Sequence, residues 1–150
     1  MKRGVLLIVS VVSLVIADAQ KPAPVHFTCS AQKTGEKQYE LRIAAATDPG
    51  WHIYAQVQPA EAIAQPTTIV FNKNPLVTLT GKPKEIGDKE TYEDKNAGIV
   101  QYQYSKVDFV QAVKMKAVAK TVITGSVTYQ ACTDEMCLPP KSVTITIPVE

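Results

Sequence analysis

Apolar and polar residues alternate along most of the chain, and this alternation predicts β-strands. Ile123, Val127 and Tyr129 occupy odd positions in residues 121–130, with mainly polar residues between them. Residues 141–149 repeat the pattern with valine and isoleucine at the odd positions. A period of two residues is typical of a strand that buries one face. These two segments therefore predict consecutive strands.

Earlier parts of the chain carry the same signal in shorter pieces, separated by turn residues such as Asp48-Pro49-Gly50. Gly81 to Gly98 breaks the pattern: it is polar, with only Ile86 and Tyr92 as large apolar residues, and it predicts a long loop. In all we expect eight or nine short strands and no substantial helix. The fold class that fits is all-β, an immunoglobulin-like antiparallel β-sandwich. The further strands are expected around residues 25–31, 39–45, 51–54, 69–71, 76–79, 100–104 and 107–115.

Residues 1–19 have the pattern of a secretory signal peptide. Lys2 and Arg3 precede an apolar run from Val5 to Ile16, and Ala17-Asp18-Ala19 offers small residues for cleavage before Gln20. The run is shorter than the roughly 20 residues that a membrane span needs. We therefore expect an exported domain of residues 20–150 without a membrane span.

Charge does not point to a polyanionic partner. The chain has 16 Lys and Arg against 14 Asp and Glu, a net charge of +2. Removal of residues 1–19 takes away Lys2, Arg3 and Asp18 and leaves +1. This near-neutral balance gives no reason to expect binding to nucleic acid or to an anionic membrane. We expect a monomer.

Cys132 and Cys137 fall in the connection between the last two predicted strands, just before Leu138-Pro139-Pro140. Surface loops on a rigid scaffold often carry function, and an exported cysteine pair can be oxidised. The position predicts either a redox-active disulfide, which exchanges with a partner's thiolate, or a structural disulfide. So small a ring contributes only about 2 kcal/mol to stability. A further alternative is a copper or zinc site formed with Met136 and either His26 or His52.

The third cysteine, Cys29, lies on the apolar side of its predicted strand, which favours a buried, inert thiol. A bridge from Cys29 to Cys132 or Cys137 is the competing arrangement. Asp134 and Glu135 lie inside the predicted ring, and their negative charge disfavours thiolates. Such a pair suits exchange with a docked partner better than exchange with free small thiols.

The segment from Gly125 to Cys132, followed by Cys137-Leu138-Pro139-Pro140, resembles the active-site hairpin of the N-terminal periplasmic domain of the thiol:disulfide interchange protein DsbD. The segment from Pro49 to Tyr54 resembles the aromatic segment of that family, and Gly81 to Glu85 and Phe109 to Gln111 also fit it. The resemblance spans roughly residues 25–149.

The resemblance implies an immunoglobulin-like fold and a domain that takes electrons from a membrane thiol reductase. It implies a location in the periplasm and transfer of those electrons to periplasmic thioredoxin-like or disulfide-isomerase proteins, with Cys132 and Cys137 as the catalytic pair. Exchange through mixed disulfides needs no cofactor. By position, His52 and Tyr54 match the aromatic shield of the cysteines, and Tyr92 matches the mobile cap.

Two departures from the family change the expectation. Known members have one more residue between the cysteines, and the sequence ends at Glu150, before their membrane segment and thioredoxin-like domain. We therefore expect any electron donor to be a separate protein, and the direction of electron flow stays open. Our leading hypothesis is a thiol–disulfide exchange carrier whose mixed disulfide forms at Cys132, because that residue ends a strand. The alternative is a non-catalytic immunoglobulin-like binding module with a structural disulfide.

Overall fold

A computed structural model describes residues 23–150, and in this part of the chain every regular element is a β-strand. The predicted signal peptide, residues 1–19, lies outside the described residues. The strands number eleven, rather than the eight or nine expected. In chain order they are β1 (Val25–Gly35), β2 (Gln38–Thr47), β3 (His52–Tyr54), β4 (Thr68–Phe71), β5 (Val77–Ile86), β6 (Glu90–Asp94), β7 (Ile99–Tyr104), β8 (Lys106–Met115), β9 (Thr121–Tyr129), β10 (Ala131–Cys132) and β11 (Lys141–Val149).

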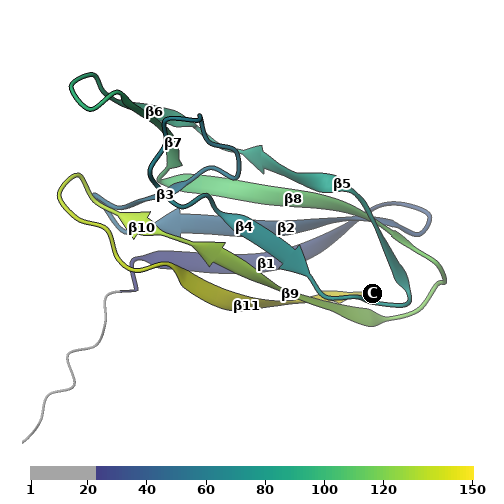
Figure 1. Cartoon of the computed structure of the whole chain (residues 1–150). Helices are drawn as coiled ribbons and strands as arrows, with labels where there is room; N and C mark the ends of the chain where they lie inside the picture. Colours follow the sequence, from purple (N-terminus) through teal and green to yellow (C-terminus); the bar gives the residue numbers. More distant parts are fainter. Residues whose placement is uncertain (1–22) are drawn as a thin grey trace, which may run out of the picture.

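The strands form three antiparallel sheets (Figure 1). A four-stranded sheet has the order β1-β2-β8-β5, and a three-stranded sheet has the order β11-β9-β4. A second four-stranded sheet, made of shorter strands, has the order β10-β3-β7-β6 and lies at one end of the molecule. We call it the end sheet. The expected antiparallel β-sandwich of the immunoglobulin-like class is confirmed.

The core lies between the faces of the sheets and uses the apolar positions that the alternation predicted. Phe109 and Leu41 come from the four-stranded sheet, and Val127 and Ile147 come from the three-stranded sheet; all four are fully buried. Polar neighbours of these residues point outward because successive side chains of a strand face opposite sides. Burial of one apolar face fixes the register of each strand, since a slip of one residue would expose that face to water.

The polar stretch of residues 81–98 is not a loop, and the expectation of one was wrong. β5 continues through it to Ile86 with an irregularity between Thr80 and Lys84, where Gln111 donates hydrogen bonds to the carbonyls of Thr80 (3.0 Å) and Gly81 (3.4 Å). Gly81 has a φ of 70°, a left-handed conformation that favours glycine.

β6 and β7 then form a hairpin that belongs to the end sheet. Asp94 closes its turn by accepting hydrogen bonds from the backbone N–H groups of Asn96 (2.9 Å) and Ala97 (3.1 Å). Almost every side chain of β6 is exposed, so this strand has no apolar face for periodicity to reveal. None of the elements in residues 23–150 is a helix long and apolar enough to cross a membrane.

Candidate functional site

The chain passes from one sheet to another just before the loop between Cys132 and Cys137, which we call the cysteine loop, and this positions the loop. β9 pairs with β11 in the three-stranded sheet and ends at Tyr129, whereas β10 begins at Ala131 and pairs with β3 in the end sheet. Gln130 is the single residue between the two strands. The chain thus leaves the sandwich and enters the end sheet immediately before Cys132, which places the cysteines beside β3.

Cys132 and Cys137 form a disulfide, and Cys29 is a free thiol. This pairing confirms the sequence prediction and excludes the bridge to Cys29. The loop inside the ring is ordered by its own hydrogen bonds: the N–H of Thr133 donates to the carbonyl of Met136 (2.7 Å), and the Thr133 hydroxyl accepts from the N–H of Met136 (3.1 Å). Beyond the ring, the N–H of Leu138 donates to the carbonyl of Ala131 (2.9 Å).

The two cysteines differ in burial. Cys132 is 1% exposed, whereas Cys137 is an exposed residue. Cys132 lies on β10, which pairs with β3 in the end sheet, whereas Cys137 follows the loop and lies outside the named strands. A thiolate approaching from solvent therefore has access to Cys137 and not to Cys132. This asymmetry opposes our sequence-based choice of Cys132, which rested on chain position and ignored burial.

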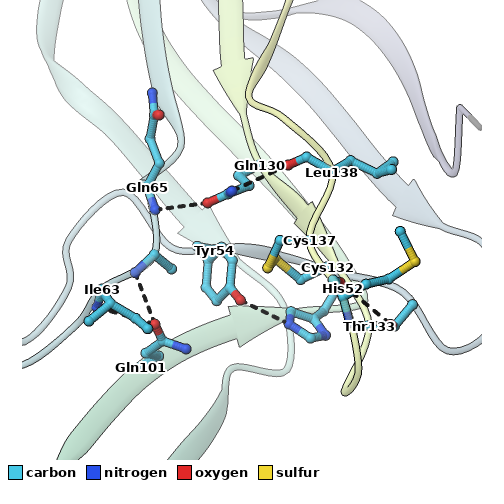
Figure 2. The surroundings of a disulfide bond; sticks show 12 residues. His52, Tyr54, Ile63, Gln65, Gln101, Gln130, Cys132, Thr133, Cys137 and Leu138 are labelled. Atoms are coloured by element: carbon cyan, nitrogen blue, oxygen red, sulfur yellow. Dashed lines mark hydrogen bonds between the residues drawn. A yellow bond between two sulfur atoms is a disulfide. The ribbon is translucent and has the colours of Figure 1, made fainter. Parts of the chain in front are cut away.

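His52 and Tyr54 of β3 lie next to the disulfide (Figure 2). His52 is directly opposite Cys132 in the pairing of β3 with β10. Its Nε2 is 3.2 Å from the Tyr54 hydroxyl, and the two rings meet edge to face with centroids 5.3 Å apart. Both side chains are buried. The resemblance matched these two residues to the shield, and the structure brings both to the cysteines.

Burial favours the uncharged form of both side chains and shifts their pKa values in opposite directions. It lowers the pKa of His52, and the nearby charges of Asp134 and Glu90 act in the opposite direction. It raises the pKa of Tyr54, while a hydrogen bond from Gln101 lowers it and the charge of Tyr92 raises it further. Both groups are therefore uncharged at neutral pH.

An open cavity of about 490 Å³ lies over the exposed cysteine, and we call it the mouth. Its charged side chains are all acidic: Asp94, Asp134 and Glu135 line it, and no lysine or arginine of residues 23–150 does. The chain as a whole has a net charge of +2, so this local excess is a property of the site. The full lining consists of His52, Tyr54, Ile63, Ala64, Tyr92, Asp94, Ile99, Gln101, Gln103, Gln130, Thr133, Asp134, Glu135, Met136 and Cys137.

Tyr92 reaches the mouth from β6, the outer strand of the end sheet. It is 44% exposed, so more than half of its surface is covered. The sequence pattern predicted a loop around Tyr92, and the structure places it on a strand of the β6–β7 hairpin. The hairpin and the cysteine loop thus contribute to the lining of the same cavity.

Two glutamines that the sequence pattern did not single out hold the mouth together (Figure 2). Gln101 accepts hydrogen bonds from the backbone N–H groups of Ile63 (3.3 Å) and Ala64 (2.9 Å). Gln130 accepts from the N–H of Gln65 (3.2 Å) and donates to the carbonyl of Leu138 (3.2 Å). Three successive N–H groups of an irregular segment are thereby satisfied by two side chains.

Gln130 also links that segment to the residue that follows Cys137. A glutamine within or beside a predicted strand is the only sequence signal for these roles, and by itself it predicts an exposed residue. Gln101 is 6% exposed because the segment of residues 63–65 covers it. Tertiary packing, and not the local pattern, turns these residues inward.

Cys29 lies apart from this site, on the edge strand β1 opposite Ile43. Its side chain is half-buried against the core, and burial raises the pKa of its thiol. A raised pKa lowers the thiolate fraction and hence the reactivity. The expectation of a free thiol is confirmed, although its burial is partial. Among residues 23–150, no three His, Cys, Asp or Glu side chains come together as a metal site.

Comparison with known proteins gives a match over most of the chain. The family model described as "Thiol:disulfide interchange protein DsbD, N-terminal" matches residues 17–148. A search of curated proteins found no match.

Among solved structures, the reduced N-terminal domain of Neisseria meningitidis DsbD has 20% identity and a TM-score of 0.46, covering 81% of this chain and 83% of that one. The N-terminal periplasmic domain of ScsB from Proteus mirabilis has 18% identity and a TM-score of 0.48, covering 81% and 44%. The yeast GGA1 GAE domain has 11% identity and a TM-score of 0.47, covering 87% and 96%.

Proposed function

This chain belongs to the family of DsbD N-terminal domains and is a thiol–disulfide exchange domain, and we propose that Cys132 and Cys137 are the pair that exchanges. The observation that carries the proposal is a disulfide with one buried and one exposed cysteine, the latter at an open mouth. A disulfide kept only for stability has no need of such a cavity. Two sulfurs carry two electrons, so exchange requires no cofactor.

Cys137 forms the mixed disulfide with the partner. A partner thiolate attacks Sγ of Cys137, the Cys132–Cys137 bond breaks, and Cys132 leaves with the electron pair and takes up a proton. A second thiol of the partner then attacks the partner's own sulfur in the mixed disulfide and releases Cys137 as a thiolate. The domain gains two electrons and the partner becomes a disulfide. Every step is reversible, so the reduced domain can pass both electrons on.

The partners follow from the family and from the mouth. The domain acts in the periplasm, accepts electrons from a membrane thiol reductase, and donates them to thioredoxin-like or disulfide-isomerase proteins. The acidic lining of Asp94, Asp134 and Glu135 favours partners with a basic surface around the reactive cysteine. It also disfavours glutathione, which is an anion.

The residues around the disulfide control access and reactivity. His52 and Tyr54 shield the buried sulfur, and Tyr92, which lines the mouth, acts as a cap that limits the approach to Cys137 until a partner docks. Asp134 and Glu135 keep the reduced thiols protonated, because a nearby negative charge disfavours a second one. The domain therefore reacts slowly with small thiols and rapidly with a docked protein.

Trapping of the mixed disulfide tests which of the two cysteines forms the bond to the partner. Cys132→Ala removes the domain's own resolving thiol. Its Cys137 should therefore form a stable mixed disulfide, visible on a non-reducing gel, with a thioredoxin-like protein that has lost its second cysteine and whose remaining cysteine is activated as a nitrobenzoate disulfide. Cys137→Ala is the matched control and should accumulate far less, because Cys132 is buried. Equal trapping by both variants would contradict the assignment of Cys137.

The reduction potential separates exchange from the alternative of a structural disulfide. Exchange proteins have reduction potentials between about −120 and −270 mV, whereas structural disulfides of exported proteins lie below about −300 mV. Equilibration of the wild-type domain with glutathione and dithiothreitol buffers measures the value. A potential in the lower range, together with no trapping, would identify a binding module with a structural bridge.

A further inference from the structure

His52 is a buried titratable residue that the exchange steps leave without a chemical role. It is 9% exposed and lies directly opposite Cys132 where β3 pairs with β10. Directly opposed residues of an antiparallel pair have their side chains on the same face, with Cβ atoms about 4.5–5.5 Å apart. The His52 side chain therefore lies on the same face of the end sheet as the Cys132 side chain, and Figure 2 shows both residues at the disulfide.

The Cys132 thiol has to lose and regain a proton in each cycle although it is shut away from water. A thiol attacks a disulfide only as its thiolate, and Cys132 is almost completely buried. A partner docked over the mouth removes the remaining route for solvent. A proton acceptor beside the sulfur is needed for the second half of the exchange.

Histidine is the side chain best suited to this task, since its ordinary pKa lies near neutrality. Besides Cys137 itself, the other titratable groups that line the mouth are the tyrosines Tyr54 and Tyr92 and the carboxylates Asp94, Asp134 and Glu135. Glu90 of β6 adds another negative charge near His52. Of these groups, His52 is the one that the strand pairing places opposite the buried cysteine.

We propose that His52 accepts the proton of the Cys132 thiol when the reduced domain oxidises, and returns it when the domain is reduced. The inference rests on the proposed exchange function and adds a catalytic residue to it. It goes beyond the shielding role, because any aromatic ring would shield and only a titratable one moves a proton.

In the donating direction, the domain passes its electrons to the partner in two exchange steps. The Cys137 thiolate attacks a partner disulfide, forms a mixed disulfide, and releases one partner sulfur as a thiolate. Neutral His52 then takes the proton of Cys132, and the resulting thiolate attacks Sγ of Cys137. The mixed disulfide breaks, the second partner sulfur leaves with the electron pair, and it can recover the proton from the imidazolium. Two electrons have passed from the domain to the partner.

The surroundings of the ring support this cycle. Burial lowers the pKa of His52, so the imidazole is neutral and able to accept a proton at neutral pH. Once it is protonated, Asp134 and Glu90 stabilise its charge. The Tyr54 hydroxyl, 3.2 Å from Nε2, holds the ring in place. When Nε2 donates to the Tyr54 hydroxyl, Nδ1 is the unprotonated nitrogen that can accept a proton.

A single-turnover reaction of the reduced domain with dithiobis(nitrobenzoate) separates the two halves of the exchange. Attack by Cys137 releases the first coloured thiolate, and attack by Cys132 on the mixed disulfide releases the second. Cys132→Ala should release only the first and so identifies the phases. The informative quantity is the ratio of the second rate to the first, measured across pH.

His52→Phe retains an aromatic ring without a titratable group, and the ratio should fall by about tenfold or more, because a positioned general base usually accelerates a reaction by at least that factor. Plotted against pH, the second rate of the wild type should also show an inflection below the ordinary histidine pKa of about 6.5. The variant should lose this inflection. His52→Gln, which keeps a polar side chain, should behave in the same way if phenylalanine disturbs the packing.

His26→Phe is the matched control. His26 is an exposed histidine of β1 bonded to Asp48 (2.8 Å), outside the mouth, and its replacement should leave the ratio as in the wild type. An unchanged ratio and inflection in both His52 variants would overturn the inference while the exchange function stands. A wild-type domain that releases no second thiolate would overturn the exchange function itself.

Discussion

Replacement of Tyr92 by alanine tests whether the β6–β7 hairpin limits access to the disulfide. Tyr92 lines the mouth together with Cys137 and is 44% exposed. If Tyr92 covers the approach to the sulfur, Tyr92→Ala should speed reduction by small thiols and leave the fold intact. The core is unaffected by the change because β6 contributes no fully buried side chain.

The covered part of the Tyr92 side chain sets the size of the effect. A tyrosine presents roughly 200 Å² of surface, so about 110 Å² is covered here. At about 25 cal/mol per Å² this corresponds to almost 3 kcal/mol, an upper bound on the contact that holds the cap. If about half of the covered surface faces the mouth, Tyr92→Ala should lower the free energy needed to expose the disulfide by about 1.4 kcal/mol. This corresponds to a reduction rate about tenfold higher.

Stopped-flow reduction of the oxidised domain by mercaptoethanol, a small neutral thiol, measures the effect. Leu79→Ala is the matched control, since Leu79 is also 44% exposed but lies on β5 away from the mouth. The reduction rate of the control should equal that of the wild type. An equal rate for Tyr92→Ala would show that Cys137 is already freely accessible, and the cap would have to be abandoned.

Three further predictions concern charge, the glutamine contacts and alkaline stability. The double variant with Asp134→Asn and Glu135→Gln should lower the thiol pKa values of the reduced domain and speed reaction with glutathione by about threefold; an unchanged pKa and rate would refute the electrostatic account. Gln130→Met should lower the free energy of unfolding by about 1–2 kcal/mol through the loss of two hydrogen bonds, and Gln130→Glu, which can still accept from Gln65, should lose less; denaturant unfolding measures both, and equal losses would refute the accounting. Tyr104 donates to Glu85 (3.0 Å), and burial and this carboxylate raise its pKa to about 12. Because the folded value lies above the unfolded value of about 10, the contribution of Tyr104 to stability is complete below pH 10 and is lost as the pH rises toward 12. Tyr104→Phe should flatten this alkaline decline in the free energy of unfolding, and a parallel decline in the variant would contradict it.

Alternation of apolar and polar residues was enough to locate the strand positions that bury one face. Residues such as Ile123, Val127 and Ile147 are fully buried, as their alternation predicted. This succeeds because the pattern of a half-buried strand is local and repeats every two residues. The cysteine spacing and the family resemblance likewise pointed to the disulfide and to the two residues of β3 that lie beside it.

The hairpin of β6 and β7 shows where the local pattern fails. β6 is exposed on both faces, so no alternation marks it, and its existence depends on hydrogen bonds to β7. Tyr92 stood out in the sequence as the one aromatic of this stretch, but its place on a strand of the mouth is a consequence of the end sheet.

The difference in access between the two sulfurs arises only in the folded chain. The chain changes sheets at Gln130, so that Cys132 pairs with β3 and becomes buried while Cys137 stays exposed. Nothing local distinguishes these two cysteines, because burial depends on a strand nearly eighty residues earlier in the chain. The same pairing puts His52 beside the buried sulfur, and packing of residues 63–65 turns Gln101 and Gln130 toward the mouth. Contacts between distant strands, which alternation cannot encode, therefore assign the chemical roles at this site.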